Sequence, residues 1–295
     1  MRESRLNKTP ASYINKNQKE KIMSTIQNID TIKSRMRDVW NAGDYGKFAM
    51  YMEPGALEIL KSWGILRGQS LLDVACGAGQ ISIPASRSGV KVTGIDIATN
   101  WIAVARARAR SEGLDAKFDE GDAECLPYPN GSFDVVATVV GAMFAPQPEK
   151  VAAEFIRVCK SGGRMLMVNW TPEGFVGQMF KTIGKHLPPP SDVPSPLLWG
   201  NEEIVKEHFG NAVSHIILTK KIYPLWHYPF DVPEVVQFFF DNYGPTKRAL
   251  QALSKEGGKS LRKELEKVFS DFNIARDGTT TLYGEYLEVD ALKKL

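Results

Sequence analysis

The sequence is poor in cysteine and histidine and contains no long apolar run. It has 3 cysteines and 4 histidines among 295 residues. No two cysteines form a Cys-x-x-Cys pair and the histidine spacing matches no metal motif, so disulfide scaffolds, zinc fingers, iron–sulfur clusters and other metal sites are disfavoured. No apolar stretch approaches the roughly 20 residues that cross a bilayer, and the N-terminus lacks the apolar segment of a secretory signal. We therefore expect a soluble, cytoplasmic protein without a membrane span.

A large excess of one charge is also missing. The chain has 37 basic and 34 acidic residues, a formal net charge of +3, which is too small by itself to indicate nucleic acid as a partner. The positive charge is concentrated at the N-terminus, because residues 1–37 hold 9 Lys or Arg against 3 Asp or Glu. Residues 1–27 are interpreted as a disordered basic tail, with a partner-binding arm as the alternative.

The sequence does contain ample apolar material, since hydrophobic residues make up 43% of it. Short apolar runs alternate with amphipathic segments, which predicts βαβ units in a Rossmann-like α/β fold with a doubly wound, mainly parallel sheet. In such a sheet the ligand crevice lies at the carboxyl ends of the strands. Strands are expected at 70–75, 90–96, 116–118, 133–140, 164–170, 213–223 and 281–289, and helices at 98–112, 148–160 and 202–209.

A single domain spanning residues 28–295 is expected, in which three further regions are added to the alternating strands and helices. Residues 28–63 have helical periodicity and are interpreted as cap helices over the crevice. Residues 171–200 are rich in proline and are predicted to form a surface loop that could act as a lid. Residues 224–280 are read as a helical insertion, with three helices between 231 and 272.

The strongest motif follows the first strand, where Asp73 leads into a loop containing Gly77 and Gly79. Glycines let the backbone turn tightly and approach a ligand, and a helix start beyond them offers N–H donors to an anionic group. Asp96 ends the second strand, where a carboxylate can accept hydrogen bonds from both hydroxyls of a ribose. The pair indicates a cofactor that contains adenosine. A nicotinamide enzyme would need a third glycine at Ser82, which makes a dehydrogenase a distant alternative.

These residues resemble the class I S-adenosylmethionine-dependent methyltransferases, and more narrowly the ubiquinone/menaquinone C-methylase-like group that acts on small molecules. The resemblance extends over four segments in the right order: LLDVACGAG, GIDIATN, EGDAECLPYPNGSFD and KSGGRMLMVNW. It implies a seven-stranded sheet of order 3-2-1-4-5-7-6 with strand 7 antiparallel. It also implies S-adenosyl-L-methionine as cofactor, S-adenosyl-L-homocysteine as product, and a small-molecule methyl acceptor.

The resemblance also assigns roles to individual residues. Asp73, Gly77 and Gly79 would surround the methionine end of the cofactor, at a loop where Ala75 replaces the family's usual first glycine without abolishing binding. Asp96 would hold the ribose and Ile97 would lie beside the adenine. The remaining positions would be Asp122 and Ala123 at the adenine ring and Gly141 and Phe144 near the sulfonium.

Residues that would contact the acceptor are less strongly indicated. His227 lies among aromatic residues and Tyr243 follows an aromatic helix, so each is a candidate substrate contact or general base, with packing as the alternative. Trp170 ends a strand at the crevice, and Trp199 and Trp226 add to the aromatic content of the variable regions. This content suggests an apolar or aromatic acceptor.

Several alternatives stay open on the sequence alone. The basic N-terminal arm would suit a methyltransferase acting on RNA or protein, although the chain lacks an Asn-Pro-Pro-Tyr-type motif, so nucleic acid is not the expected partner. A non-catalytic protein that binds the cofactor is a further alternative. The aromatic helix around 238–240 is expected to be core or the face of a homodimer.

Overall fold

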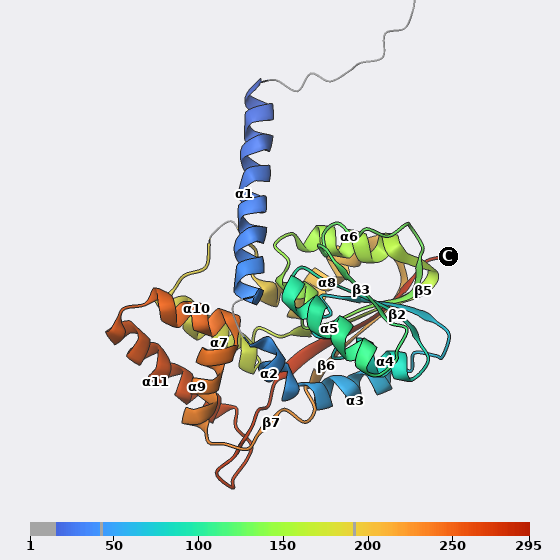
Figure 1. Cartoon of the computed structure of the whole chain (residues 1–295). Helices are drawn as coiled ribbons and strands as arrows, with labels where there is room; N and C mark the ends of the chain where they lie inside the picture. The colour runs from blue at the N-terminus through green and yellow to red at the C-terminus, as the bar shows by residue number, and fades with distance from the viewer. Residues whose placement is uncertain (1–15, 42–43, 191–192) are drawn as a thin grey trace, which may run out of the picture.

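One seven-stranded sheet organises the molecule, for which the computed structural model describes residues 16–41, 44–190 and 193–295, with the backbone alone at 16–28 and 45. The strand order is β3-β2-β1-β4-β5-β9-β6 (Figure 1). The five strands β3, β2, β1, β4 and β5 pair in parallel, and β9 is antiparallel to both β5 and β6. This confirms the predicted order and its antiparallel strand. The strands are β1 (Ser70–Val74), β2 (Lys91–Asp96), β3 (Lys117–Glu120), β4 (Phe133–Val139), β5 (Cys159–Trp170), β6 (Val213–Ile222) and β9 (Glu285–Lys293).

Helices cover the sheet on both sides because its strands are apolar on both faces. β1, for example, is buried from Leu71 to Val74, as expected for a central parallel strand. Figure 1 shows α6 above the sheet and α3 and α4 below it. The covering helices are α3 (Glu53–Trp63), α4 (Ser82–Arg87), α5 (Thr99–Ser111), α6 (Pro148–Val158) and α8 (Glu202–Phe209), with short 3-10 turns η1 (Ala142–Phe144), η2 (Pro196–Gly200) and η3 (Gly210–Ala212).

A group of helices beside the sheet comes from the late part of the chain. It contains α9 (Val232–Asn242), α10 (Gly244–Ala252) and α11 (Lys255–Asp271), which confirms the three helices predicted there. Aromatic rings join them to the body, since Phe269 lies 4.7 Å from Phe175 and 4.8 Å from Phe239 between ring centroids. Phe239 and Phe240 of the aromatic helix are buried in the core of this single chain. These two side chains therefore need no second subunit to cover them, and the homodimer stays a prediction.

The proline-rich region differs from its prediction. Its first half forms α7 (Phe175–His186), which buries Phe175, Val176 and Met179 on one side. The prediction of a loop over all of 171–200 was wrong because the prolines cluster after residue 187 and leave an uninterrupted amphipathic segment before them. Figure 1 shows α7 beside α9 and α10, as part of the helical group rather than a strap over the surface.

The N-terminal region also differs in part. The helix α1 runs over Lys16–Asn41 and is followed by α2 (Tyr45–Met50). The segment predicted as a disordered tail is therefore helical from Lys16 onward, while residues 1–15 lie outside the described residues. Because each added residue extends an existing helix at little cost, the amphipathic segment after residue 28 can support additional turns before it. None of the helices described combines the length and apolar character that crossing a membrane requires.

The last strand begins later than predicted. Thr280–Thr281 forms a separate short strand, β8, which pairs with β7 (His227–Tyr228). Tyr283 and Gly284 lie outside any strand, and the Gly284 carbonyl accepts a hydrogen bond from the Tyr223 N–H at 2.8 Å. A side chain at Gly284 would lie 2.9 Å from the Trp226 ring. Trp226 therefore packs closely against the backbone just before β9, which starts at Glu285.

Candidate active site

The loop after β1 is shaped by residues with positive φ. Ala75, Gly77 and Gly79 have φ of +56°, +52° and +84°, a region that glycine adopts freely and alanine only at some cost. The loop is tied to the end of β2, because the Gly77 N–H donates to Asp96 Oδ2 at 2.8 Å. The glycine motif and the acidic strand end that the sequence singled out thus form one unit.

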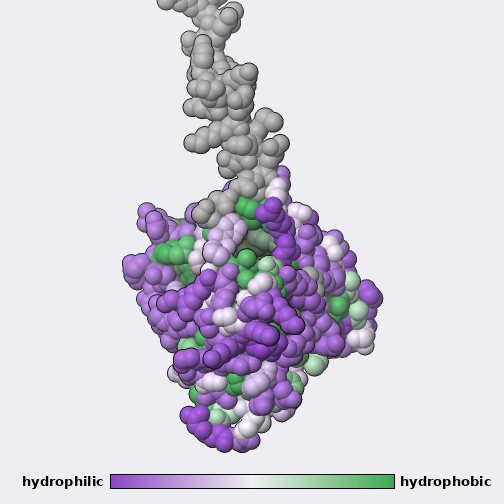
Figure 2. Space-filling view, turned by 90° about the vertical axis from the view of Figure 1, so that its left-hand side faces the viewer, coloured by the Kyte–Doolittle hydropathy of each residue, from purple (hydrophilic) through white to green (hydrophobic). Residues whose placement is uncertain are grey.

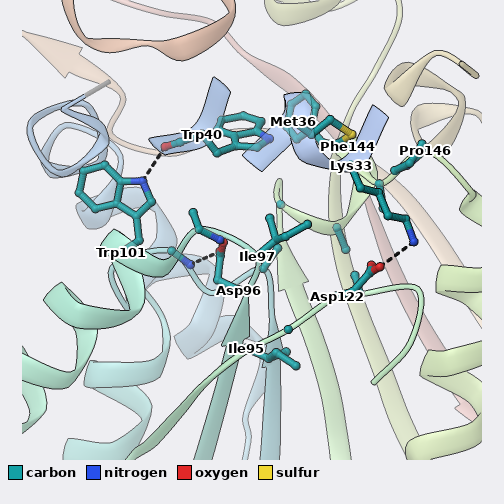
Figure 3. A pocket seen from close by; sticks show the side chains of 18 of the residues that line it. Lys33, Met36, Trp40, Ile95, Asp96, Ile97, Trp101, Asp122, Phe144 and Pro146 are labelled. Atoms are coloured by element: carbon teal, nitrogen blue, oxygen red, sulfur yellow. Dashed lines mark hydrogen bonds and ion pairs between the residues drawn. The ribbon is translucent and has the colours of Figure 1, made fainter. Parts of the chain in front are cut away.

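Asp96 is held at the end of β2 by backbone donors. Its other oxygen accepts from the Ala98 N–H at 2.8 Å, and Figure 3 shows the carboxylate at the base of a cleft. Burial raises the pKa of the Asp96 carboxyl, whereas the hydrogen bonds from Ala98 and Gly77 lower it. The side chain is therefore oriented and partly desolvated, and a ligand hydroxyl can reach it without further rearrangement.

A cleft of about 760 Å³, counting its open mouth, lies above Asp96; we call it the main cleft. Most of the residues predicted to bind the cofactor meet here, although they come from four separate strand ends. Apolar side chains form most of its wall, and Figure 2 shows an apolar hollow below the grey atoms on an otherwise mostly hydrophilic face. The lining includes Ala75, Gly77, Asp96, Ile97, Trp101, Asp122, Ala123, Val140, Gly141 and Phe144, together with Lys33, Met36 and Trp40 from α1.

Lys33 closes one end of the main cleft. Its ammonium group lies 2.6 Å from Asp122 Oδ2 and 2.5 Å from Glu124 Oε2, and Figure 3 shows it reaching from α1 to Asp122. The Glu124 side chain is only 1% exposed. Burial raises the pKa of Glu124, and Lys33 opposes this shift. At the other end, the Trp101 Nε1–H donates to the Trp40 carbonyl at 2.9 Å, so α1 is fastened on both sides of the cleft.

A second cavity, the loop cavity, lies on the other side of the glycine loop and has about 470 Å³ of empty space. Asp73 is its charged residue, and it is 1% exposed. Burial raises the pKa of the Asp73 carboxyl to about 7, against a partial lowering by its 2.6 Å hydrogen bond from Ser82. Asp73 makes no ion pair with the described residues, so a buried carboxylate here suits a ligand that brings a positive charge. Gly79 lines neither cavity but shapes the loop between them.

A third cavity, the aromatic cavity, has about 320 Å³ of empty space. Stacked pairs form its walls: Trp170 and Trp226 have centroids 5.3 Å apart, and Phe48 and Tyr243 have centroids 4.8 Å apart. No charged side chain occurs among its described lining residues. They are Trp40, Phe48, Met52, Val140, Phe144, Trp170, Val176, Met179, Trp226, Phe239 and Tyr243.

The predicted acceptor residues are divided by the fold. Trp170, Trp226 and Tyr243 line the aromatic cavity. Trp199 is buried elsewhere, with its ring 4.9 Å from that of His208, and it lines none of the three cavities. His227 is exposed on β7, where its Nδ1 lies 2.9 Å from Thr281 Oγ1, and it too lies outside the three linings.

Several lining residues were missed by the sequence reasoning. Lys33, Met36 and Trp40 follow one another at helical spacing on α1, and a lysine in line with apolar neighbours is the signal that could have revealed this wall. Met52, Val140 and Met179 carried no such signal, because a buried aliphatic residue at a site looks like any core residue. Their roles depend on tertiary contacts.

The comparisons with known proteins agree with this geometry. The family model described as a methyltransferase domain matches residues 72–167. Two uncharacterized proteins of Mycobacterium tuberculosis are 37% identical over 221 residues (74% of this chain, 80% of the relative) and 33% identical over 268 residues (90% and 96%). A demethylmenaquinone methyltransferase of Thermus thermophilus is 29% identical over 199 residues, 66% of this chain and 76% of the relative.

Solved structures show the same fold at low identity. The YcgJ protein of Bacillus subtilis has a TM-score of 0.54 at 20% identity, covering 82% of this chain and 98% of that one. Phosphoethanolamine N-methyltransferase 2 of Haemonchus contortus, in complex with S-adenosylhomocysteine, has a TM-score of 0.53 at 20% identity and covers 81% and 52%. The chain belongs to the S-adenosylmethionine-dependent methyltransferases. It is an enzyme of that family, and S-adenosylmethionine is its cofactor.

The described residues fit this cofactor. At Gly141 the backbone passes so close to the glycine loop that a Cβ would lie 2.6 Å from the Ala75 Cβ, so the crevice is kept narrow where two strand ends meet. Asp96 can accept from ribose hydroxyls, and the buried Asp73 can accept from an ammonium group. Apolar walls beside Ile97 and Ala123 suit a flat base.

Proposed function

We propose that the enzyme methylates a small, apolar, aromatic acceptor that binds in the aromatic cavity. The observation that carries this proposal is the lining of that cavity, which joins stacked aromatic rings with methionines and contains no charged side chain among the described residues. Such walls favour a flat, uncharged ring system through area burial and ring stacking. The cavity shares Trp40, Val140 and Phe144 with the main cleft, so an acceptor there would lie next to the cofactor.

Two curated relatives support an aromatic acceptor by their names. One is the demethylmenaquinone methyltransferase of Thermus thermophilus, and the other is a ubiquinone biosynthesis O-methyltransferase of Nitrosococcus oceani that is 34% identical over 136 residues, 45% of this chain and 56% of the relative. Both names contain the name of a quinone. The proposal for this chain is restricted to the shared chemistry, an aromatic small molecule.

The chain's own residues would act by binding and orientation. When bound, S-adenosylmethionine supplies a methyl group on a positively charged sulfur. Asp96, Asp122 and Asp73 would hold the cofactor's ribose, adenine and ammonium groups, and the aromatic cavity would hold the acceptor and exclude water. Fixing two reactants in near-attack geometry can supply roughly 7–11 kcal/mol of a barrier.

Tyr243 is the residue we propose for any proton removal from the acceptor. It is the lining residue of the aromatic cavity that carries a hydroxyl, and it is only 5% exposed. His227 would require a rearrangement of β7 to reach the same cavity. An acceptor that enters with a free lone pair or as its conjugate base needs no such group.

The proposal is tested by methyl transfer to a panel of aromatic thiols, phenols and amines, with RNA and a peptide as comparison acceptors. We expect transfer to at least one aromatic compound, and Trp226→Phe should lower its kcat/KM about fivefold to 30-fold because the smaller ring loses roughly 1–2 kcal/mol of contact. The affinity for S-adenosylhomocysteine should not change, since Trp226 lines neither the main cleft nor the loop cavity.

Trp63→Phe is the matched control for Trp226→Phe. Trp63 is also buried but lines none of the three cavities, so its replacement should leave kcat/KM unchanged. Transfer to RNA or peptide with none to the aromatic panel would refute the proposed acceptor class. An equal loss in both tryptophan variants would show that packing, and not acceptor contact, is responsible.

Lys33→Met should speed the dissociation of S-adenosylhomocysteine about threefold to tenfold. The substitution removes the ion pairs with Asp122 and Glu124 that fasten α1 over the main cleft, and partly buried pairs of this kind contribute more than exposed ones. Lys47→Met is the control, because Lys47 pairs with Asp44 on the exposed surface. Stopped-flow fluorescence of the bound complex measures the rate, and equal rates in all three proteins would contradict the role of Lys33.

A further inference from the structure

Val140, at the end of β4, is the point where the three cavities meet. The main cleft and the loop cavity share Ala75, Gly77, Val140 and Gly141. The aromatic cavity shares Trp40, Phe144 and Val140 with the main cleft, and Met52 and Val140 with the loop cavity. Among the described lining residues, Val140 alone belongs to all three.

The backbone of Val140 has an unusual conformation. Its φ is +48°, a region that β-branched residues rarely adopt because of crowding around Cβ. The residue is anchored by its N–H, which donates to the Val168 carbonyl at 2.9 Å, and the next residue, Gly141, packs directly against the Ala75 backbone, where a Cβ would lie 2.7 Å from the carbonyl oxygen. Strained residues of this kind persist where the surrounding structure holds them, and they cluster at functional sites.

The order of chemical groups in the cofactor indicates which group would lie beside Val140, where the three cavities meet. In S-adenosylmethionine the sulfur joins the ribose to the amino-acid end. Asp96 marks the ribose side in the main cleft and Asp73 marks the ammonium side in the loop cavity. The sulfur is therefore expected at the wall that these two cavities share, and its methyl group is expected on the side open to the aromatic cavity.

We propose that Val140 is a specificity-determining residue whose isopropyl group bounds the space where the sulfonium methyl group and the acceptor atom meet. Its bulk admits acceptors whose reactive atom is unhindered and excludes those with substituents directly beside that atom. The substrate class is thereby narrowed from aromatic molecules to aromatic nucleophiles without two ortho substituents. This inference rests on the proposed function for its acceptor and on the family for its cofactor.

The first test needs no acceptor. Val140→Leu should weaken S-adenosylmethionine at least fivefold more than S-adenosylhomocysteine, because the longer side chain occupies the space of the one methyl group by which the two molecules differ. Calorimetry on the same preparation gives both dissociation constants, and their ratio cancels any loss of folded protein. Val140→Ile, which keeps the β-branch and adds one carbon, serves if the leucine variant does not fold. An unchanged ratio would overturn the proposal.

The second test uses thiophenol and 2,6-dimethylthiophenol as acceptors. Val140→Ala should raise the kcat/KM of the hindered thiol relative to the unhindered one at least tenfold. Val92→Ala is the matched control, because Val92 is buried in β2 and lines none of the three cavities, and it should leave this ratio unchanged. If the ratio of kcat/KM for the hindered to the unhindered thiol were equal in both variants, the proposed selection of acceptors by Val140 would be refuted.

The two tests separate the inference from the function on which it rests. If the unaltered enzyme binds both cofactor forms but methylates no aromatic compound, the proposed acceptor class fails, and the binding ratio of Val140→Leu still decides whether Val140 borders the methyl group. If aromatic compounds are methylated but neither ratio changes, the proposed function stands and the role of Val140 is refuted.

Discussion

Asp96→Ala should weaken S-adenosylhomocysteine binding by about 1.5–3 kcal/mol, which is about tenfold to 150-fold in the dissociation constant. Two contributions have the same sign. The carboxylate would no longer accept hydrogen bonds from the ribose, and the Gly77 and Ala98 N–H groups would lose the acceptor that now lies 2.8 Å from each. Calorimetry at pH 8 measures the change.

Asp96→Asn separates these two contributions. Asparagine has nearly the same shape and keeps one acceptor oxygen for the loop, but it lacks the charge. We expect an intermediate affinity together with a thermal unfolding midpoint close to that of the unaltered protein. If Asp96→Ala bound the ligand as tightly as the unaltered protein, the ribose role of Asp96 would have to be abandoned.

Asp73→Asn should stabilise the unliganded protein at pH 8 by about 2–4 kcal/mol while weakening S-adenosylhomocysteine binding about tenfold or more. Burial raises the pKa of the Asp73 carboxyl from 3.8 to about 7. Between these two values the folded protein holds a proton that the unfolded chain has released. The free energy of unfolding therefore falls as the pH rises through this window, and the asparagine variant, which cannot ionise, lacks this fall. Urea unfolding at pH 5 and pH 8 measures the difference.

The same carboxyl predicts a pH dependence of binding. Below about pH 7 Asp73 carries a proton in the unliganded protein, and that proton must leave before the carboxylate can pair with the ligand's ammonium group. The affinity for S-adenosylhomocysteine should fall by up to about tenfold per pH unit as the pH drops from 7 to 5.5. Asp73→Asn should flatten this profile. A sloping profile in the variant, or a flat one in the unaltered protein, would assign the titration to another group.

Much of the sheet could be predicted because buried parallel strands have a recognisable local sequence pattern. Runs such as FDVVATVV are apolar on both faces and end in turn residues, and the alternation with amphipathic helices restricts the topology to few choices. The helix α7 was missed because the prolines of the region 171–200 were taken to indicate a loop throughout, although the apolar spacing of Phe175, Val176 and Met179 is helical. The late start of β9 could not be foreseen, because the packing of Gly284 against Trp226 joins two segments that are distant in sequence.

For the site, the sequence by itself determined which residues we propose for cofactor binding. Gly77 and Asp96 lie after two strand ends and are joined by a backbone hydrogen bond. A tight turn needs glycine and a ribose contact needs a carboxylate, so both positions can be recognised from residue type and spacing. The acceptor cavity that we propose is visible only in the tertiary structure. Val140 and Trp226 line the aromatic cavity together only because the fold brings them there, and an aromatic or aliphatic side chain gives no sign in the sequence of whether it packs in the core or lines a cavity. The scarcity of cysteine and histidine and the small net charge agree with the proposed function, because binding and orienting two reactants in an apolar cavity needs no metal site and no large charge.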